Sequence, residues 1–326
     1  MPRDGAEIIE TPAAALPRQA ALGLPEYGLI ALQAMLWGST FFFVAITRPF
    51  LPPMSLSALR LLPAVALLLV VVAALGLRLP ATVPEWRRVL MFSILNNVVP
   101  FALITLALRE MTGGVAAIFM AAAPLSALIL APWFIADERF TWCRFAGIVM
   151  GIGGVAVLAG VSGTENGSGT WRGQGMLLLA TVSFSGANIY ARKFMGGYHP
   201  FALASAQTIG SLILVLPLAL LIDRPWQIAN PPGYVWLAAL AMGTLGSALA
   251  PLCHFTVLKR SGAVNAMLSS IVVPVTPVLL GWAFLGETLT LGELLGGVII
   301  ALSLVVIDGR AVMWAHRRAT SFGTGL

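Results

Sequence analysis

Long apolar runs separated by short polar segments make up almost the whole chain. A membrane-spanning helix needs about 20 apolar residues, and ten runs meet or approach that length. We predict the spans to be Tyr27–Thr47, Ala58–Leu79, Val89–Leu108, Gly113–Phe134, Thr141–Val161, Gly173–Ala191, Pro200–Ile222, Tyr234–Leu258, Gly262–Leu285 and Leu291–Ile307. The pattern therefore predicts an all-α polytopic membrane protein with ten transmembrane helices.

Two stretches of the chain, residues 111–141 and 261–290, follow the same plan. Each has small residues, an apolar helix with an interior proline (Pro124, Pro274), and then a glutamate (Glu138, Glu287) and a threonine. The spacing is 150 between the prolines and 149 between the glutamates, so the two halves are copies with one slipped residue.

Each copy holds five spans, an odd number, so the second copy must enter the membrane in the opposite orientation. Inverted repeats of this size are typical of transporters, which bind substrate near the midplane where the repeats meet. We predict a disordered cytoplasmic tail (1–26), a first five-helix repeat (27–161), an external linker (162–172), a second five-helix repeat (173–307) and a basic cytoplasmic tail (308–326).

Composition supports the membrane assignment. The chain is 59% apolar and 10% charged, with a mean hydropathy of +0.92, whereas soluble domains carry about 25% charged residues. The net charge of +6 is scattered between apolar runs, so it does not indicate nucleic-acid binding. With a cytoplasmic N-terminus, 14 of the 19 lysines and arginines fall on the inside and 4 in outside loops. This bias predicts a multi-pass inner-membrane protein with both termini in the cytoplasm.

Polar side chains within the predicted spans are the candidates for lining a substrate cavity, with Trp37 as an aromatic wall. These residues are Trp37, Ser39, Thr40, Asn96, Asn97, Asn188, Gln207, Ser247, Asn265 and Ser269. Small and hydroxylated residues also let helices pack closely, and that alternative remains open for Ser39 and Thr40. Neither Cys143 nor Cys253 lies in a CxxC pair, so no disulfide, metal or cofactor is expected.

Prolines interrupt the spans at related places in the two halves: Pro100, Pro251, Pro124, Pro274 and Pro277. Each removes a backbone amide and frees a carbonyl one turn earlier, which predicts free carbonyls at Asn96 and Ser247. Such groups are tolerated only against protein or a water-filled cavity. They therefore mark either a binding site or kinks whose carbonyls neighbouring helices satisfy.

Three further features have structural and functional interpretations. Arg60 lies about one turn inside the second span, where it either snorkels to the interface or turns inward as a structural pair or an anion contact.

Glu138 and Glu287 precede the fifth and tenth helices and are expected to cap them, and Thr290-Leu-Gly-Glu293 reads as a capping box. Glycines spaced by four in the same helices predict close packing, either as scaffold helices or as the interface of a homodimer.

The combination of ten spans, Trp37-Gly-Ser-Thr40, a proline and then Arg60 in the second span, and the repeated proline–glutamate–threonine motif resembles the EamA family of the drug/metabolite transporter superfamily. The resemblance covers nearly the whole chain. It implies a ten-helix basket of two inverted units that moves small metabolites, such as amino acids or drugs, often outward.

The charge pattern narrows the expected substrate. All 13 acidic residues fall in tails, loops or terminal turns of spans. A cationic substrate bound within the membrane would therefore lack the counter-charge that a buried cation needs. We therefore expect two partners for this chain: a neutral or zwitterionic small-molecule substrate and the lipid bilayer that surrounds the carrier. A channel or scaffold is the main alternative. An intramembrane enzyme would need paired catalytic groups, and His254 would be its only general base.

The predicted topology can be tested with reporter fusions. Fusions at Ser168 and at the C-terminus should report opposite sides of the membrane, because Ser168 belongs to the external linker and the tail to the cytoplasm. Alkaline phosphatase and a fluorescent protein, which are active on opposite sides, provide the two readouts. The same readout from both positions would exclude the inverted-repeat interpretation.

Overall fold

The computed structural model describes residues 23–134, 142–163, 169–261 and 269–308. Within these residues the chain forms helices and turns without a strand. The helices are α1 (Leu24–Thr47), α2 (Pro53–Ala74), α3 (Val83–Ser93), η1 (Ile94–Val98), α4 (Val99–Ala107), α5 (Gly113–Ala121), α6 (Ala123–Phe134), α7 (Trp142–Ser162), α8 (Trp171–Phe194), α9 (Pro200–Leu218), η2 (Ala219–Asp223), η3 (Pro225–Gln227), α10 (Gly233–Ala241), η4 (Met242–Leu249), α11 (Ala250–Ser261), α13 (Ser269–Val272), α14 (Val275–Leu280), η5 (Gly281–Leu285) and α15 (Leu291–Asp308).

Several continuous helical segments have the length and apolar composition of membrane spans, so the chain is a multi-pass membrane protein. Within the described residues seven qualify: Leu24–Thr47, Pro53–Ala74, Val83–Ala107, Gly113–Phe134, Trp142–Ser162, Pro200–Asp223 and Gly233–Val257. Two shorter apolar segments follow, Ser269–Leu285 and Leu291–Ile307. Helix α8 is 24 residues long and carries Arg192 and Lys193 in its last turn.

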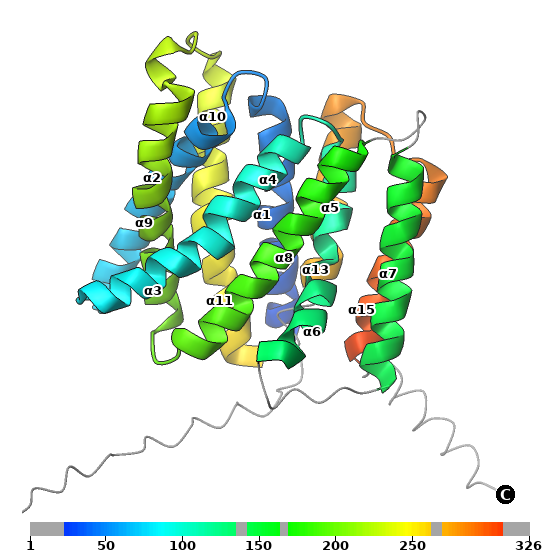
Figure 1. The fold of residues 1–326 in the computed structure, drawn as a ribbon. Coiled ribbons are helices and arrows are strands. Elements are labelled where there is room, and N and C mark those ends of the chain that lie inside the picture. The colour runs from blue at the N-terminus through cyan, green and yellow to red at the C-terminus, as the bar shows by residue number, and fades with distance from the viewer. Residues whose placement is uncertain (1–22, 135–141, 164–168, 262–268, 309–326) are drawn as a thin grey trace, which may run out of the picture.

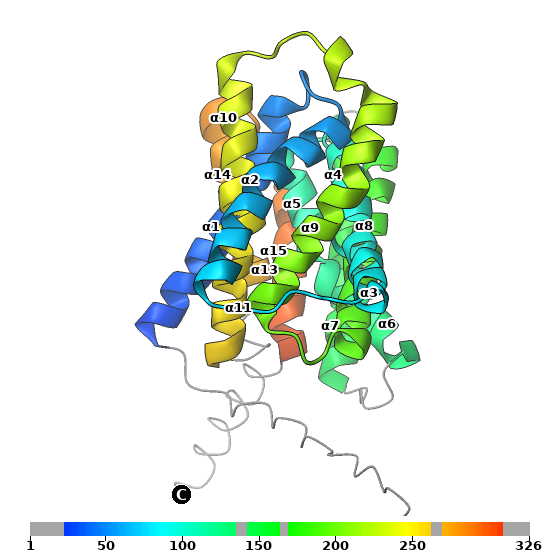
Figure 2. The ribbon, with the colours of Figure 1, turned by 90° about the vertical axis from the view of Figure 1, so that its left-hand side faces the viewer.

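Helices such as α1, α7 and α11 run side by side, α3–α4 and α8 cross the bundle obliquely, and both ends of the described core emerge on the same side (Figures 1 and 2). Exposed apolar side chains such as Val149, Ile152, Leu294 and Val298 cover α7 and α15, which suits contact with lipid. Polar side chains such as Gln33 are instead buried inside the bundle. This distribution follows from the cost of exposing polar groups to hydrocarbon.

The ends of several spans differ from the sequence prediction. The second span begins at Pro53 instead of Ala58, because a proline at the first helical position loses no hydrogen bond. The third begins at Val83 instead of Val89. There Thr82 and Glu85 form a capping box, which starts the helix within a more polar segment.

The expected homodimer through glycine-rich helices is not supported, because α7 and α15 pack against each other within one chain (Figure 1). A Cβ atom added to Gly154 would lie 3.0 Å from the backbone nitrogen of Ile300, and one added to Gly296 would lie 2.9 Å from that of Leu158. The glycines thus let the two backbones approach closely. The faces that carry these glycines are therefore covered within one chain.

The capping box predicted at the start of the last helix is confirmed. The backbone N–H of Thr290 donates to the Glu293 carboxylate at 2.8 Å, and the Glu293 N–H donates to the Thr290 hydroxyl at 3.3 Å. Glu293 is fully buried, so these bonds also compensate the burial of its polar atoms.

Neighbouring glycines in α7 provide a matched test of the helix contact. Gly154→Ala should lower stability by about 1–3 kcal/mol, because the new methyl group meets backbone of α15 that cannot move aside. Gly153→Ala should cause no loss, because nothing lies within 4 Å of its Cβ position. Thermal unfolding of the two purified variants in detergent measures the difference. Equal melting temperatures would show that the contact is looser than described.

Candidate functional site

The third and eighth spans change from α-helical to π-helical at related places in the two halves. Segment η1 lies between α3 and α4, and η4 lies between α10 and α11. Each is followed shortly by a proline, Pro100 or Pro251. A π-helical turn inside an α-helix displaces side chains from their regular positions and is frequent at functional sites.

The π-helical register corrects the prediction that Pro100 frees the Asn96 carbonyl. The Val99 N–H bonds to the Ile94 carbonyl, five residues back, so the carbonyl left without its partner by Pro100 is that of Leu95. The hydroxyl of Ser183 in α8 donates to the Leu95 carbonyl at 2.7 Å. A neighbouring helix therefore supplies the hydrogen bond that this carbonyl lacks within its own helix. This agrees with the interpretation of the proline as a kink whose carbonyl a neighbouring helix satisfies.

Arg60 connects η1 and η4. Its Nη1 donates to the hydroxyl of Ser247 in η4 at 2.6 Å, and its Nη2 donates to Oδ1 of Asn97 in η1. The guanidinium lies over the ring of Phe101, 3.5 Å from its centroid, which adds a cation–π contact. One side chain from α2 thus joins residues from both halves of the chain.

The structure excludes the snorkelling interpretation of Arg60. Only 6% of the residue is exposed. Because α2 begins at Pro53, Arg60 lies seven residues, or about 10 Å, along the helix. The first turn of η4 packs closely against this part of α2, because a Cβ atom added to Gly243 would collide with the Arg60 carbonyl and with Pro63.

A second polar cluster joins α1, α11 and α13. The Nε2 atom of Gln33 lies 3.0 Å from Nδ1 of His254 and 2.7 Å from Oγ of Ser269. With the Gln33 amide nitrogen as the donor, Nδ1 of His254 accepts this hydrogen bond. The imidazole also lies 5.2 Å from the Trp37 ring, centroid to centroid. Trp37 and Ser269 from the predicted set therefore meet here.

Sequence reasoning missed Gln33, which organises this cluster. Its side chain is fully buried, and its Oε1 atom has no hydrogen-bond partner among the described residues. A glutamine within an apolar run is the signal that could have identified it, since a buried amide needs partners on other helices.

The other predicted residues are more dispersed. The Ser39 hydroxyl donates to the carbonyl of Leu36 on its own helix at 2.8 Å, as the packing alternative expected. Thr40 packs directly on Gly246 of η4. Asn96 and Gln207 are half-buried. Asn188 is exposed on α8 and takes part in none of the hydrogen bonds of the two clusters. Asn265 and Glu138 lie outside the described residues.

The proline breaks in the fourth and ninth spans are present. Helix α5 ends at Ala121 just before Pro124, and Pro274 separates α13 from α14. In the ninth span Pro277 cannot donate to the Val273 carbonyl. Gly38 of α1 packs against that carbonyl, with its Cβ position 3.0 Å from Pro277 Cδ. A glycine is needed there because the helices cross at backbone contact.

Glu287 caps a helix, but not the one that was expected. Its carboxylate accepts hydrogen bonds from the backbone N–H groups of Gly113 and Gly114 at the start of α5, in the other half of the chain. Burial raises the pKa of this carboxyl above its ordinary value, while the two amides and the nearby Arg48 oppose the rise. Burial also lowers the pKa of Arg48, and Glu287 opposes that change.

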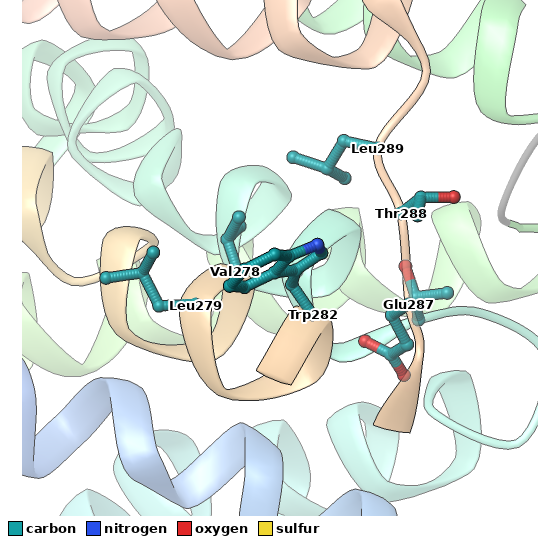
Figure 3. Close-up of a pocket in the computed structure, with 8 residues that line it drawn as sticks. Val278, Leu279, Trp282, Glu287, Thr288 and Leu289 are labelled. Carbon is teal, nitrogen blue, oxygen red and sulfur yellow. The ribbon is translucent and has the colours of Figure 1, made fainter. Parts of the chain in front are cut away.

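A cavity of about 300 Å³ lies beside this cap. Its lining residues are Thr112, Gly114, Val278, Leu279, Trp282, Glu287, Thr288 and Leu289. Figure 3 shows Trp282 in this view between Leu279 and Glu287. Neither the Arg60 cluster nor the Gln33 cluster contributes to the lining, so the cavity is separate from both.

The inter-half cap can be tested by substitution. Glu287→Ala should cost about 1–2 kcal/mol, because it leaves the amides of Gly113 and Gly114 without their acceptor. Glu287→Gln should cost less, because its carbonyl oxygen still accepts a hydrogen bond. Melting temperatures of the two variants in detergent measure the effect. A loss equal in both would assign the stabilisation to charge and not to capping.

A sequence model of the EamA-like transporter family matches the chain twice, at residues 24–160 and 171–308. A solved crystal structure aligns with a TM-score of 0.64 at 21% identity, over 89% of this chain and 97% of the other. That likeness concerns the fold alone.

Curated relatives are named as transporters. The uncharacterized inner membrane transporter YedA of Escherichia coli K12 is 26% identical over 87% of this chain and 90% of its own. A protein of Streptantibioticus cattleyicolor, named a probable terminal-alkyne amino-acid exporter, is 25% identical over 64% of this chain and 68% of its own. Because the family matches cover both halves, the chain belongs to the EamA-like transporter family.

Proposed function

We propose that this transporter is a secondary carrier that exports or exchanges small neutral or zwitterionic metabolites, amino acids among them, by alternating access. The observation that carries the proposal is the Arg60 cluster, because it joins Asn97 and Ser247, which occupy related positions in the two halves. A site built from both halves changes its access when one half rocks against the other.

The proposed architecture is ten transmembrane helices in two inverted repeats, 27–161 and 173–307, in the inner membrane with cytoplasmic termini. It is supported by the double family match, by the π-helical segments η1 and η4 at related places in the two halves and by the emergence of both core ends on one side (Figure 2). The positive-inside bias orients that side toward the cytoplasm.

The substrate class rests on the chemistry available within the spans. Apart from the Arg60 guanidinium, amide, hydroxyl and aromatic groups dominate the two clusters, at Gln33, Asn97, Ser247, Ser269 and Trp37. Such groups suit neutral or zwitterionic solutes, because they fix orientation by hydrogen bonds without adding net charge. The name of the amino-acid exporter among the relatives is consistent with this class.

Counterflow tests the proposal. Proteoliposomes loaded with unlabelled neutral amino acids or nucleosides should accumulate the matching labelled solute without any pH difference, because exchange needs only a binding site with alternating access. His254→Ala should keep exchange independent of pH. Simple equilibration without counterflow would indicate a channel. A pH difference that drives concentrative transport even in His254→Ala would require another proton-carrying group and contradict the proposed site.

A further inference from the structure

Arg60 is a buried cation without an anionic partner among the described residues. Only 6% of the residue is exposed, and no carboxylate of the described residues forms an ion pair with it. Removing a charge from water costs several kcal/mol unless an opposite charge compensates it. Ionisable groups within membrane spans therefore usually have a paired group or lie on a substrate pathway.

The groups that bind the Arg60 guanidinium in the part of the chain that the structure describes are neutral. Asn97 and Ser247 each accept one hydrogen bond, and the Phe101 ring covers the guanidinium at 3.5 Å. A guanidinium has five N–H donors, and the Nε–H is buried without an acceptor among the described residues. The Asn97 amide, the Ser247 hydroxyl and the Phe101 ring thus hold the guanidinium in position, and some of its N–H donors remain available to another acceptor.

The geometry favours one kind of anion. A guanidinium presents parallel N–H groups that match the two oxygens of a carboxylate. Within the described part of the chain no second cation shares the acceptors on Asn97 and Ser247, so one negative charge balances the charge of Arg60. A phosphate dianion would leave a negative charge uncompensated in a low-dielectric environment.

We propose that Arg60 is the counter-charge for the carboxylate of the transported substrate, so that the substrates are carboxylate-bearing solutes such as zwitterionic amino acids. This inference rests on the proposed carrier function and selects within its substrate class. Bound substrate would complete the hydrogen bonding of Arg60 at the junction of η1 and η4. Occupancy would then be sensed by both halves, because Asn97 and Ser247 hold the same guanidinium.

Asn97→Asp separates this role from a merely structural one. The aspartate has the shape of asparagine but supplies Arg60 with an internal carboxylate, so the variant should be at least as thermostable as the natural protein. It should also compete with the substrate carboxylate and lower amino-acid exchange by about 30-fold or more, the size of effect seen when a buried charge loses its proper partner. If Arg60 only clamps η1 to η4, Asn97→Asp keeps both stability and exchange.

The experiment is counterflow of labelled leucine, threonine and phenylalanine, with adenosine and uridine as neutral solutes that lack a carboxylate. We expect exchange of at least one amino acid by the natural protein, and its loss in Asn97→Asp and in Arg60→Gln. Leucinamide, which lacks the carboxylate, should not compete with leucine. Folding of each variant is checked by its melting temperature, and Asn97→Asp remains informative if Arg60→Gln does not fold.

Three outcomes would overturn the inference, and they differ from failure of the proposed function. Exchange of nucleosides alone, competition by leucinamide equal to that by leucine, or undiminished amino-acid exchange by Asn97→Asp would each reject the role of Arg60 while leaving a carrier. Exchange of none of the five solutes by the natural protein would instead reject the carrier function and the inference with it.

Discussion

Hydrogen bonding inside hydrocarbon is the constraint on which the rest of this structure depends. Without water in the bilayer core, each polar group must find a partner within the protein. Serine and threonine hydroxyls accordingly donate to carbonyls of their own helices, as Ser93, Thr105 and Thr208 do. Where a helix departs from α geometry, a neighbour supplies the missing bond, as Ser183 does for Leu95.

The same constraint makes polar groups the connections between the two halves. Gln33 on α1 reaches His254 and Ser269 in the second half, and Ser93 donates to the carbonyl of Gln207 at 2.9 Å. Asp223 accepts from the Ser55 amide in the first turn of α2 at 2.6 Å, and Glu287 caps α5. Such contacts are directional, so they specify a particular arrangement of the halves around the apolar core that both halves share.

The contacts between helices divide into two kinds. The α7–α15 pair is closed by glycines at backbone contact and apolar side chains, which resists relative movement because a close-packed interface has no alternative fit. Around Arg60 and Gln33 the contacts are hydrogen bonds next to π-helical segments and proline breaks. Bonds of this kind exchange partners at little cost when a polar solute offers equivalent ones. Structural support and proposed substrate recognition thus lie on different helices.

Much of the fold could be predicted from the sequence, because apolar length and proline spacing are properties of the chain. The positions of the spans, the capping box at Thr290 and the breaks at Pro124 and Pro274 follow from local patterns. Only the tertiary structure decided which groups meet: that Arg60 turns inward to Asn97 and Ser247, that Glu287 caps α5 and not α15, and that Gln33 contacts His254. These choices are made between segments distant in sequence, where a side chain has several acceptors of equal chemistry and the packing of helices selects among them.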